Sequence, residues 1–451
     1  MPASLPLKTK DQLDALLSEA VKEGKVPGAS LVVGSPDTEL YFGAYGVMSL
    51  GDPSAGNIDR NSIFWVCSHT KLVVTIAFLQ LIEAGKLTYD TPAADLLPEL
   101  ADPIVLDTPL SPTSTYTKAK NPILVRHLLN HSSGMYALVD EKHPDELNVV
   151  YTSATYVGEG PHGKERYSRA EFYRLVKRGF PAVPLVFEPG TNWSYSYGCD
   201  LLGFILEDLT GQTIQEYCDE HLFAPLNIRP TFYIDSEIEK KLVQLTYRRR
   251  SDGAFEKWAD QLSIPERRKD KMGITLGAIA MHSTLSEYLA ILQHLLLIKE
   301  NRASNPILTH ETVSRMFESS LPPASSKALF QFTSMGEIYP KDSEVELNFG
   351  LGICLAKEDW DGKKKEGSGF CAFLLFFLSL FFAPFFCSGK LTWLVLNLGA
   401  SGYGWAGTYY FMDPQTGIAA VYGTHLVPTF DPEVKELWDR LERTLYAGLQ
   451  E

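Results

Sequence analysis

Residues 64–82, FWVCSHTKLVVTIAFLQLI, join a short apolar run to a longer run of helical character, with a serine and a lysine at the junction. Ser68 falls at the start of the helical run, and Lys71 follows one turn later on the same face. A hydroxyl at a helix N-terminus lies near the positive end of the helix dipole, and an amine on the same face can take or share its proton. The spacing makes Ser68 and Lys71 a candidate nucleophile–base pair, although serine is also a common N-cap and lysine a common surface residue.

Short motifs elsewhere in the chain follow the order seen in a known enzyme superfamily. They are VPGA at 26–29, SHTK at 68–71, ILVRHLLNHSSG at 123–134, FEPG at 187–190, YS at 195–196, LLG at 201–203 and WAG at 405–407. The tetrad has the S-x-x-K form of the nucleophile motif of β-lactamases and penicillin-binding proteins. Over nearly its whole length the chain therefore resembles the superfamily that contains class C β-lactamases, β-lactamase-fold esterases and the lovastatin-type acyltransferase.

The resemblance implies that Tyr195 belongs to the second motif of this superfamily, Tyr-x-Asn, whose tyrosine works with the lysine as general base and then general acid. A phenol has an ordinary pKa of about 10, so it needs an adjacent ammonium to act as a base at neutral pH. Which of Tyr195 and Lys71 takes the proton stays open, as does the simpler interpretation of Tyr195 as one packed aromatic beside Trp193. Tyr197 replaces the asparagine that commonly contacts the substrate, which argues against β-lactam recognition.

The third motif of the superfamily is Lys-Thr-Gly in β-lactamases and Trp-x-Gly in the esterase branch, and Trp405 and Gly407 match the second form. The resemblance implies that the backbone N–H of Thr408 faces the developing oxyanion, opposite the N–H of Ser68, and that Gly407 leaves room for this approach. Residues 402–407 also fit G-x-G-x-x-G, the dinucleotide-binding pattern, which requires a helix after it. The next residues, TYYFM, are typical of a strand, so we favour the oxyanion interpretation.

Other candidate catalytic groups are assigned structural roles. His131 stands beside Ser132 and Ser133, in a segment that the superfamily uses as a helix end and turn. His69 and Thr70 lie inside the tetrad, and we assign neither a role in proton transfer. The chain has no G-x-S-x-G and no H-E-x-x-H motif. We expect no metal ion and no organic cofactor.

Strand-like sequence gathers near the two ends of the chain. The periodicity predicts helices over about 10–23 and from 432 onward. It predicts strands over about 29–34, 39–46, 407–412 and 417–422. Most of the sequence between about 70 and 300 is helical or loop-like. We predict one β-lactamase/transpeptidase-like α+β domain over 1–451. Its mainly antiparallel sheet comes from about 1–60 and 275–451, is flanked by the terminal helices, and has a helical region of about 61–274 inserted in it.

The charge balance excludes nucleic acid as a partner. The net charge of −14 repels phosphate backbones, and no basic run is longer than three residues, as in RRR at 248–250 and KKK at 363–365. The six cysteines lack the spacing of metal ligands, and the first residues lack the apolar region of a signal peptide. We therefore expect reduced thiols and a cytoplasmic protein.

One segment departs from the rest of the chain in composition. Residues 370–387, FCAFLLFFLSLFFAPFFC, are almost uninterrupted apolar sequence whose length borders on that of a membrane span. Removing 369–401 joins KEGS directly to GYGWAGTYYF, the continuous form that the superfamily shows before its third motif. We therefore interpret 369–401 as a non-native insertion, such as a translated intron. A membrane-anchored or non-catalytic binding module is the alternative.

Together these features predict serine-dependent acyl transfer through an acyl-enzyme on Ser68. The expected substrates are small-molecule esters or thioesters, with water, an alcohol or an acyl carrier as the possible second partner. Hydrolysis and transfer stay open, because the choice depends on whether the pocket excludes water and binds an alcohol. The resemblance to the lovastatin-type acyltransferase favours a transesterase of secondary metabolism, and we expect no membrane partner.

Overall fold

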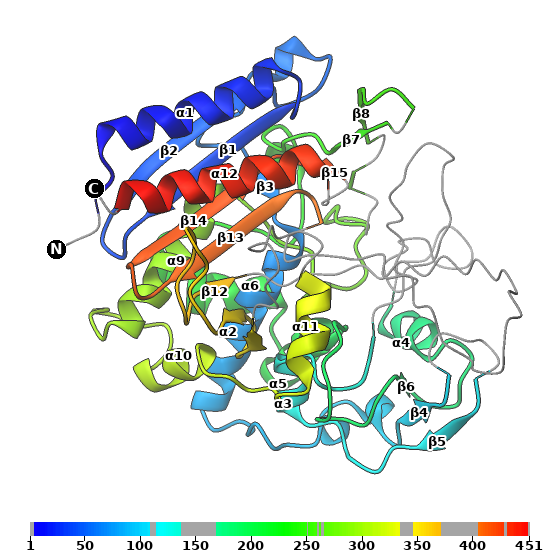
Figure 1. Cartoon of the computed structure of the whole chain (residues 1–451). Helices are drawn as coiled ribbons and strands as arrows, with labels where there is room; N and C mark the ends of the chain where they lie inside the picture. Colours follow the sequence, from blue (N-terminus) through cyan, green and yellow to red (C-terminus); the bar gives the residue numbers. More distant parts are fainter. Residues whose placement is uncertain are drawn as a thin grey trace, which may run out of the picture.

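The computed structural model describes residues 4–108, 114–136, 168–249, 251–258, 261–262, 266–333, 346–370, 405–427 and 431–449. Their largest sheet has the strand order β10-β11-β12-β13-β14-β1-β2, and its neighbours are antiparallel (Figure 1). Its strands are β1 (Gly28–Gly34), β2 (Glu39–Gly46), β10 (Leu347–Phe349), β11 (Cys354–Ala356), β12 (Gly369–Phe370), β13 (Thr408–Asp413) and β14 (Ile418–Gly423). Because β14 pairs with β1, the two ends of the chain meet in one sheet, as the sequence predicts.

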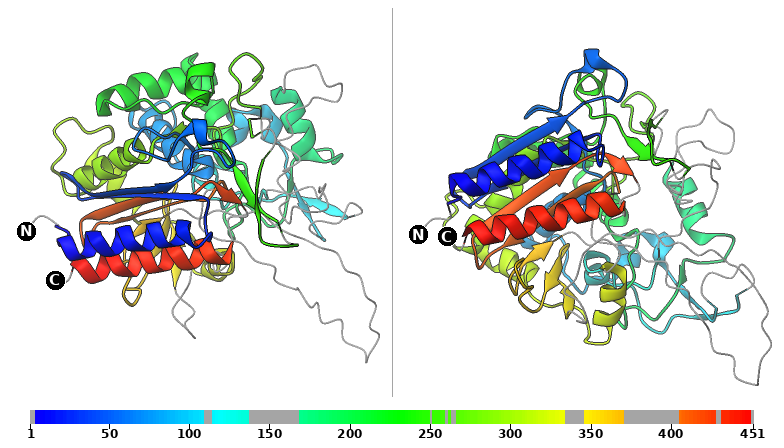
Figure 2. Two further views of the ribbon diagram at one scale, coloured as in Figure 1. Left: turned by 90° about the horizontal axis from the view of Figure 1, so that it is seen from above. Right: turned by 45° about the horizontal axis from the view of Figure 1, so that its top comes forward.

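The terminal helices α1 (Leu7–Lys22) and α12 (Pro432–Leu449) lie side by side on one face of this sheet (Figures 1 and 2). The apolar stripe of α1 is buried there, and α12 contributes Trp438. The Trp438 ring lies 5.4 Å from that of Tyr409 on β13 and 5.8 Å from that of Tyr422 on β14. An aromatic contact of this kind adds to the area-dependent stabilisation of a buried helix.

Two aspartates fix the C-terminal elements at the predicted positions. Asp431 is the N-cap of α12: its carboxylate accepts the backbone N–H groups of Glu433 and Val434. Asp413 ends β13, and its carboxylate accepts the N–H groups of Gln415 and Thr416 in the turn to β14. Because these hydrogen bonds join residues close in sequence, the sequence alone was sufficient to predict the start of α12 and the turn between β13 and β14.

The opposite face of the sheet is covered by α9 (Leu285–Lys299), which contacts β1 and β14 (Figure 2). Helix α2 (Thr70–Glu83) contacts α5 and is buried over almost its whole length. The other α-helices are α3 (Val125–Leu129), α4 (Arg169–Lys177), α5 (Gly198–Thr210), α6 (Ile214–Cys218), α7 (Ala224–Leu226), α8 (Ser236–Glu239), α10 (His310–Met316) and α11 (Ser325–Thr333). Helices α9–α11 fall within 275–451, so that stretch is less uniformly sheet than predicted.

The central region also contains three small sheets that the sequence did not predict. One pairs β3 (Phe64–Trp65) with β9 (His282–Ser283). The other strands are β4 (Ile104–Leu106), β5 (Tyr116–Lys118) and β6 (Pro184–Leu185) in one sheet, and β7 (Thr246–Arg248), β8 (Phe255–Lys257) and β15 (Leu426–Val427) in another. Strands of two or three residues are too short to show a periodic pattern in the sequence. The division of the chain into a single domain stays a prediction.

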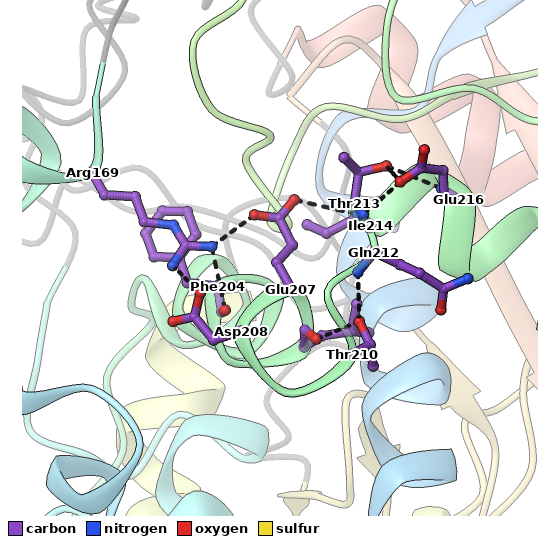
Figure 3. A network of polar contacts seen from close by, with 10 residues as sticks. Arg169, Phe204, Glu207, Asp208, Thr210, Gln212, Thr213, Ile214 and Glu216 are labelled. Atoms are coloured by element: carbon purple, nitrogen blue, oxygen red, sulfur yellow. Dashed lines mark hydrogen bonds and ion pairs between the residues drawn. The ribbon is translucent and has the colours of Figure 1, made fainter.

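A polar network ties α4 to α5 and α6 (Figure 3). The Arg169 guanidinium lies 2.8 Å from a carboxylate oxygen of Glu207 and 2.6 Å from one of Asp208. Glu207 also accepts the backbone N–H of Ile214, the first residue of α6. Thr213 caps α6 and forms a reciprocal capping box with Glu216. Through Glu207, the C-terminal half of α5 is therefore joined to both neighbouring helices.

The lysine run at 363–365 is not a basic surface patch. Lys363 and Lys364 are buried, and both ammonium groups contact the buried carboxylate of Glu442 on α12, at 3.5 and 2.9 Å. Lys363 also lies 2.6 Å from Asp439. Burial of a charge is tolerated only when the charge is paired, so these contacts fix the segment before β12 to the C-terminal helix.

The alternative of a membrane anchor rests on sequence that the structure does not describe. Among the helices of the described residues, none is both long and apolar enough to cross a bilayer. Residues 371–404, which contain most of the apolar segment, lie outside the described residues. The anchor and the insertion interpretation therefore stay predictions.

Candidate active site

Ser68 lies in the 3₁₀ turn Cys67–His69, between β3 and α2. The backbone of Cys67 has a φ of 46°, in the left-handed region that residues with a side chain seldom adopt. Thr70 fixes this turn, because its hydroxyl donates to the carbonyl of Cys67 and accepts the N–H of Met281 at 3.0 Å. The Ser68 hydroxyl is thus held at the N-terminal end of a buried helix, where the sequence placed it.

Lys71 lies one turn along α2, and its Nζ is 3.1 Å from Ser68 Oγ. The same amine donates to the carbonyl of Ala278 at 2.8 Å. Only 5% of the lysine surface is exposed. These two contacts fix the amine beside the nucleophile.

Tyr195 reaches the same hydroxyl from the segment that leads into α5. Its OH lies 3.2 Å from Ser68 Oγ, and Lys71 Nζ lies 4.7 Å from the centre of its ring. Ser68 Oγ therefore meets both predicted proton-transfer groups within hydrogen-bond distance. This is the geometry required for a nucleophile that is activated by a neighbouring base.

Strand β13 brings Thr408 beside the nucleophile turn. Side chains alternate along a strand, so Thr408 and Tyr410 face away from α12. The Tyr410 ring lies 4.8 Å from that of His69, and the Thr408 hydroxyl donates to the carbonyl of Val66 at 3.4 Å. Thr408 is thus close to the turn that carries Ser68, while its role in an oxyanion hole stays a prediction. Because β13 is a strand, the G-x-G-x-x-G match at 402–407 lacks the helix that dinucleotide binding requires.

Gly407 is also needed for the packing of the backbone. Its φ is 72°, and a Cβ placed on it would lie 2.8 Å from the carbonyl oxygen of Leu426. Its own carbonyl accepts the N–H of Thr424 at 3.0 Å. The glycine therefore allows close contact with the chain after β14, while the room that it leaves at the oxyanion site stays a prediction.

Trp405 and Tyr197, the two departures from the β-lactamase motifs, are both buried. The Trp405 ring lies 5.6 Å from that of Trp65 on β3 and 5.6 Å from that of Trp258, edge to face in both cases. Tyr197 precedes α5 and packs 5.9 Å from the ring of Phe172 on α4. Large aromatic rings thus occupy the places of the two polar groups.

His69 is enclosed between Tyr288 and Tyr410, at ring distances of 5.2 and 4.8 Å. Burial lowers its pKa to about 3, so the imidazole stays neutral at physiological pH. His69 is therefore a neutral side chain packed between two aromatic rings, and we assign it no role in proton transfer.

Sequence reasoning missed the groups that hold Lys71 from outside the tetrad. The carbonyl of Ala278 accepts its amine, and the backbone N–H of Ala278 donates to the carboxylate of Asp200 at 2.9 Å. Asp200 is fully buried in the first turn of α5. An aspartate inside the apolar run GCDLLG was a signal for such a buried contact, but the sequence did not reveal its partner.

Comparisons with known proteins identify the family of the chain. The chain is 27% identical to the acyltransferase mokF of Monascus pilosus over 379 residues, covering 80% of this chain and 84% of that protein. It is 28% identical to the lovastatin esterase of Penicillium rubens over 371 residues, covering 78% and 84%. It shares the fold of unliganded simvastatin synthase from Aspergillus terreus, with a TM-score of 0.73, 22% identity and coverage of 97% and 98%. The Beta-lactamase family model matches residues 13–443, so the chain belongs to the β-lactamase family and has its α+β fold, with the terminal helices packed on an antiparallel sheet.

Proposed function

We propose that this protein is a serine esterase or acyltransferase that forms an acyl-enzyme on Ser68. The observation that carries the proposal is the convergence of Lys71 Nζ and Tyr195 OH on Ser68 Oγ, at 3.1 and 3.2 Å. These residues come from two separate parts of the chain. Their burial also excludes the bulk water that would weaken the interactions.

In the proposed reaction Ser68 Oγ attacks the carbonyl carbon of an ester or thioester. The hydroxyl proton passes to the Lys71–Tyr195 pair, and the backbone N–H groups of Ser68 and Thr408 stabilise the oxyanion. Collapse of the tetrahedral intermediate breaks the bond to the alcohol or thiol, which leaves with the proton. The acyl group then passes from Ser68 to water or to an alcohol, with the same pair acting as base.

The proposed substrates are esters or thioesters of small molecules in secondary metabolism, with an alcohol or an acyl carrier as the possible second partner. The names of the relatives support this class, since one is an acyltransferase and one a lovastatin esterase. The bulk of Trp405 and Tyr197 supports a preference for esters or thioesters over β-lactams. A cytoplasmic location is part of the proposal.

The test is intact mass spectrometry after exposure to a series of activated acyl esters and thioesters. A mass increase equal to the acyl group is expected, and it is lost in Ser68→Ala. Addition of candidate alcohols then separates transfer from hydrolysis, because transfer yields a new ester and hydrolysis a free acid. Near-normal esterase activity in Ser68→Ala would exclude the proposal.

A further inference from the structure

His131 contacts the segment that carries Tyr195, the proposed proton-transfer group, through both its backbone and its ring. Its backbone carbonyl accepts the N–H of Ser194 at 3.0 Å, and its Nδ1 lies 3.3 Å from the N–H of Ser196. Both neighbours of Tyr195 in the chain, Ser194 and Ser196, are therefore hydrogen-bonded to His131. The imidazole also stacks on the Tyr195 ring, with the ring centres 4.8 Å apart and the planes at 27°.

The backbone and the surroundings of His131 make this contact specific. Its φ of 60° is left-handed, which brings the carbonyl and the ring of His131 onto the same segment. The edges of Trp193 and Phe349 enclose the imidazole at ring distances of 6.1 and 5.4 Å. Burial lowers the pKa of His131 to about 3, so the imidazole is neutral. The Ser196 N–H points at Nδ1, which assigns the lone pair to Nδ1 and the ring proton to Nε2.

We propose that His131 is a positioning residue that holds the Tyr195 hydroxyl on Ser68 Oγ. The inference rests on the proposed function. A proton-transfer group must stay within a few tenths of an ångström of its working position, and a displacement of about 1 Å costs up to about 100-fold in rate. Only a ring that also carries an acceptor can both stack on the phenol and bind the Ser196 N–H. This role differs from the purely structural one that the sequence indicated.

The test compares His131→Asn with His127→Asn. Asparagine tolerates the left-handed backbone at 131, so it removes the stack with little strain. His127 is a matched control: it is buried, its pKa is lowered to about 4 by burial, and its Nδ1 accepts the N–H of Leu124 at 3.1 Å. It lies in α3.

The expected result is that H131N lowers kcat by about 10- to 100-fold with KM changed by less than about twofold, whereas H127N leaves both near the wild-type values. Rates are expressed per acylatable Ser68, so loss of folded protein does not imitate loss of rate. His131→Gly, which removes the ring and adopts a positive φ without strain, gives a similar loss and serves if H131N does not fold.

A double-mutant cycle separates positioning from general damage. In a Tyr195→Phe background the hydroxyl to be positioned is absent, so adding H131N is expected to change kcat by less than about twofold. Equal effects of H131N in both backgrounds, or equal losses in H131N and H127N, would overturn the inference. Failure of the proposed function would appear separately, as Ser68→Ala and Tyr195→Phe enzymes that keep normal turnover.

Discussion

Deletion of residues 369–401 is expected to give a soluble, folded and active chain. Strand β12 lies between β11 and β13, with Gly369 opposite Met412 and Phe370 opposite Phe411. After the deletion, Ser368 is followed by Gly402 and Tyr403. A glycine and an aromatic residue therefore enter the same two positions, and the register of the sheet is kept.

The structure also gives the size of the favourable and unfavourable effects of this deletion on folding stability. A Cβ at Gly369 would lie 2.7 Å from Ile353 Cδ1, so this position requires the glycine that the junction supplies. The connection to β13 shortens from residues 371–407 to residues 404–407, which reduces the entropic cost of loop closure by about 2 kcal/mol. In return, the Tyr403 hydroxyl enters the buried site of Phe370 and costs about 1–3 kcal/mol if it is unpaired. The net change in folding stability is therefore small.

The gain is expected in solubility, because the deletion removes eight phenylalanines from a segment with no helical or strand periodicity. Soluble yield, Tm and turnover of an activated ester are measured for the full chain and for three deletions. Removal of 371–403 keeps Gly369 and Phe370, and so tests the cost of the hydroxyl alone. Removal of 369–402 places Tyr403 at the position of Gly369, and is expected to abolish folding.

The comparison can refute the argument in two ways. A full-length protein that is stable and active, beside an inactive 369–401 deletion, would show that the segment belongs to the working enzyme. Equal behaviour of the 369–401 and 369–402 deletions would show that β12 does not pair in the register described.

Three further predictions follow from the site and the core. Gly407→Ala is expected to lower the free energy of unfolding, measured in urea, by at least about 1–2 kcal/mol and to reduce ester turnover, because alanine is strained at φ 72° and meets Leu426. Burial opposes ionisation of Glu442, but the charges of Lys364 and Lys363 hold its pKa below its usual value. Glu442→Gln is therefore expected to lower the free energy of unfolding by about 3–5 kcal/mol near pH 7. The contribution of the Glu442 carboxylate is fully present above its pKa in the unfolded chain, about 4.3, and is lost as the pH falls through its lower pKa in the folded chain. Urea titrations should therefore show the difference in stability between wild type and Glu442→Gln becoming smaller in acid. Because Trp405 replaces a lysine, kcat/KM for the best simple ester is expected to exceed that for a cephalosporin by about 100-fold or more, and comparable values would contradict this.

Features encoded by neighbours in the sequence were predictable. Ser68 and Lys71 are three residues apart, so helical geometry alone places them together. The Asp431 cap and the turn after Asp413 depend on side chains that bind their own neighbouring backbone. Tyr195 is different, because its distance from Ser68 along the chain allowed no argument from spacing, and only the resemblance to a family identified it.

Features set by packing between distant segments were not predictable. The contact between Lys71 and Ala278, and the stacking of His131 on Tyr195, join residues whose separation follows no period. Lys363 illustrates the same limit for charge, because a run of three lysines is normally solvated. Only the fold shows that Glu442 is buried against it. Gly407 was recognised as necessary, but the reason depends on a strand that the sequence alone could not position.

The base that activates Ser68 can be identified by changing the acidity of the phenol. If Lys71 is an ammonium, it donates to both Ser68 Oγ and the Ala278 carbonyl, and Tyr195 must accept the proton as a phenolate. If Lys71 is neutral, its lone pair faces Ser68 while an N–H donates to Ala278, and Tyr195 keeps its proton. Replacement of Tyr195 by a ring-fluorinated tyrosine lowers the phenol pKa. The acid limb of the kcat/KM profile is then expected to move to lower pH if the phenolate is the base, and to stay in place if Lys71 is the base. A shift equal to the change in phenol pKa therefore assigns the role of base to Tyr195, and a profile that does not move assigns it to Lys71.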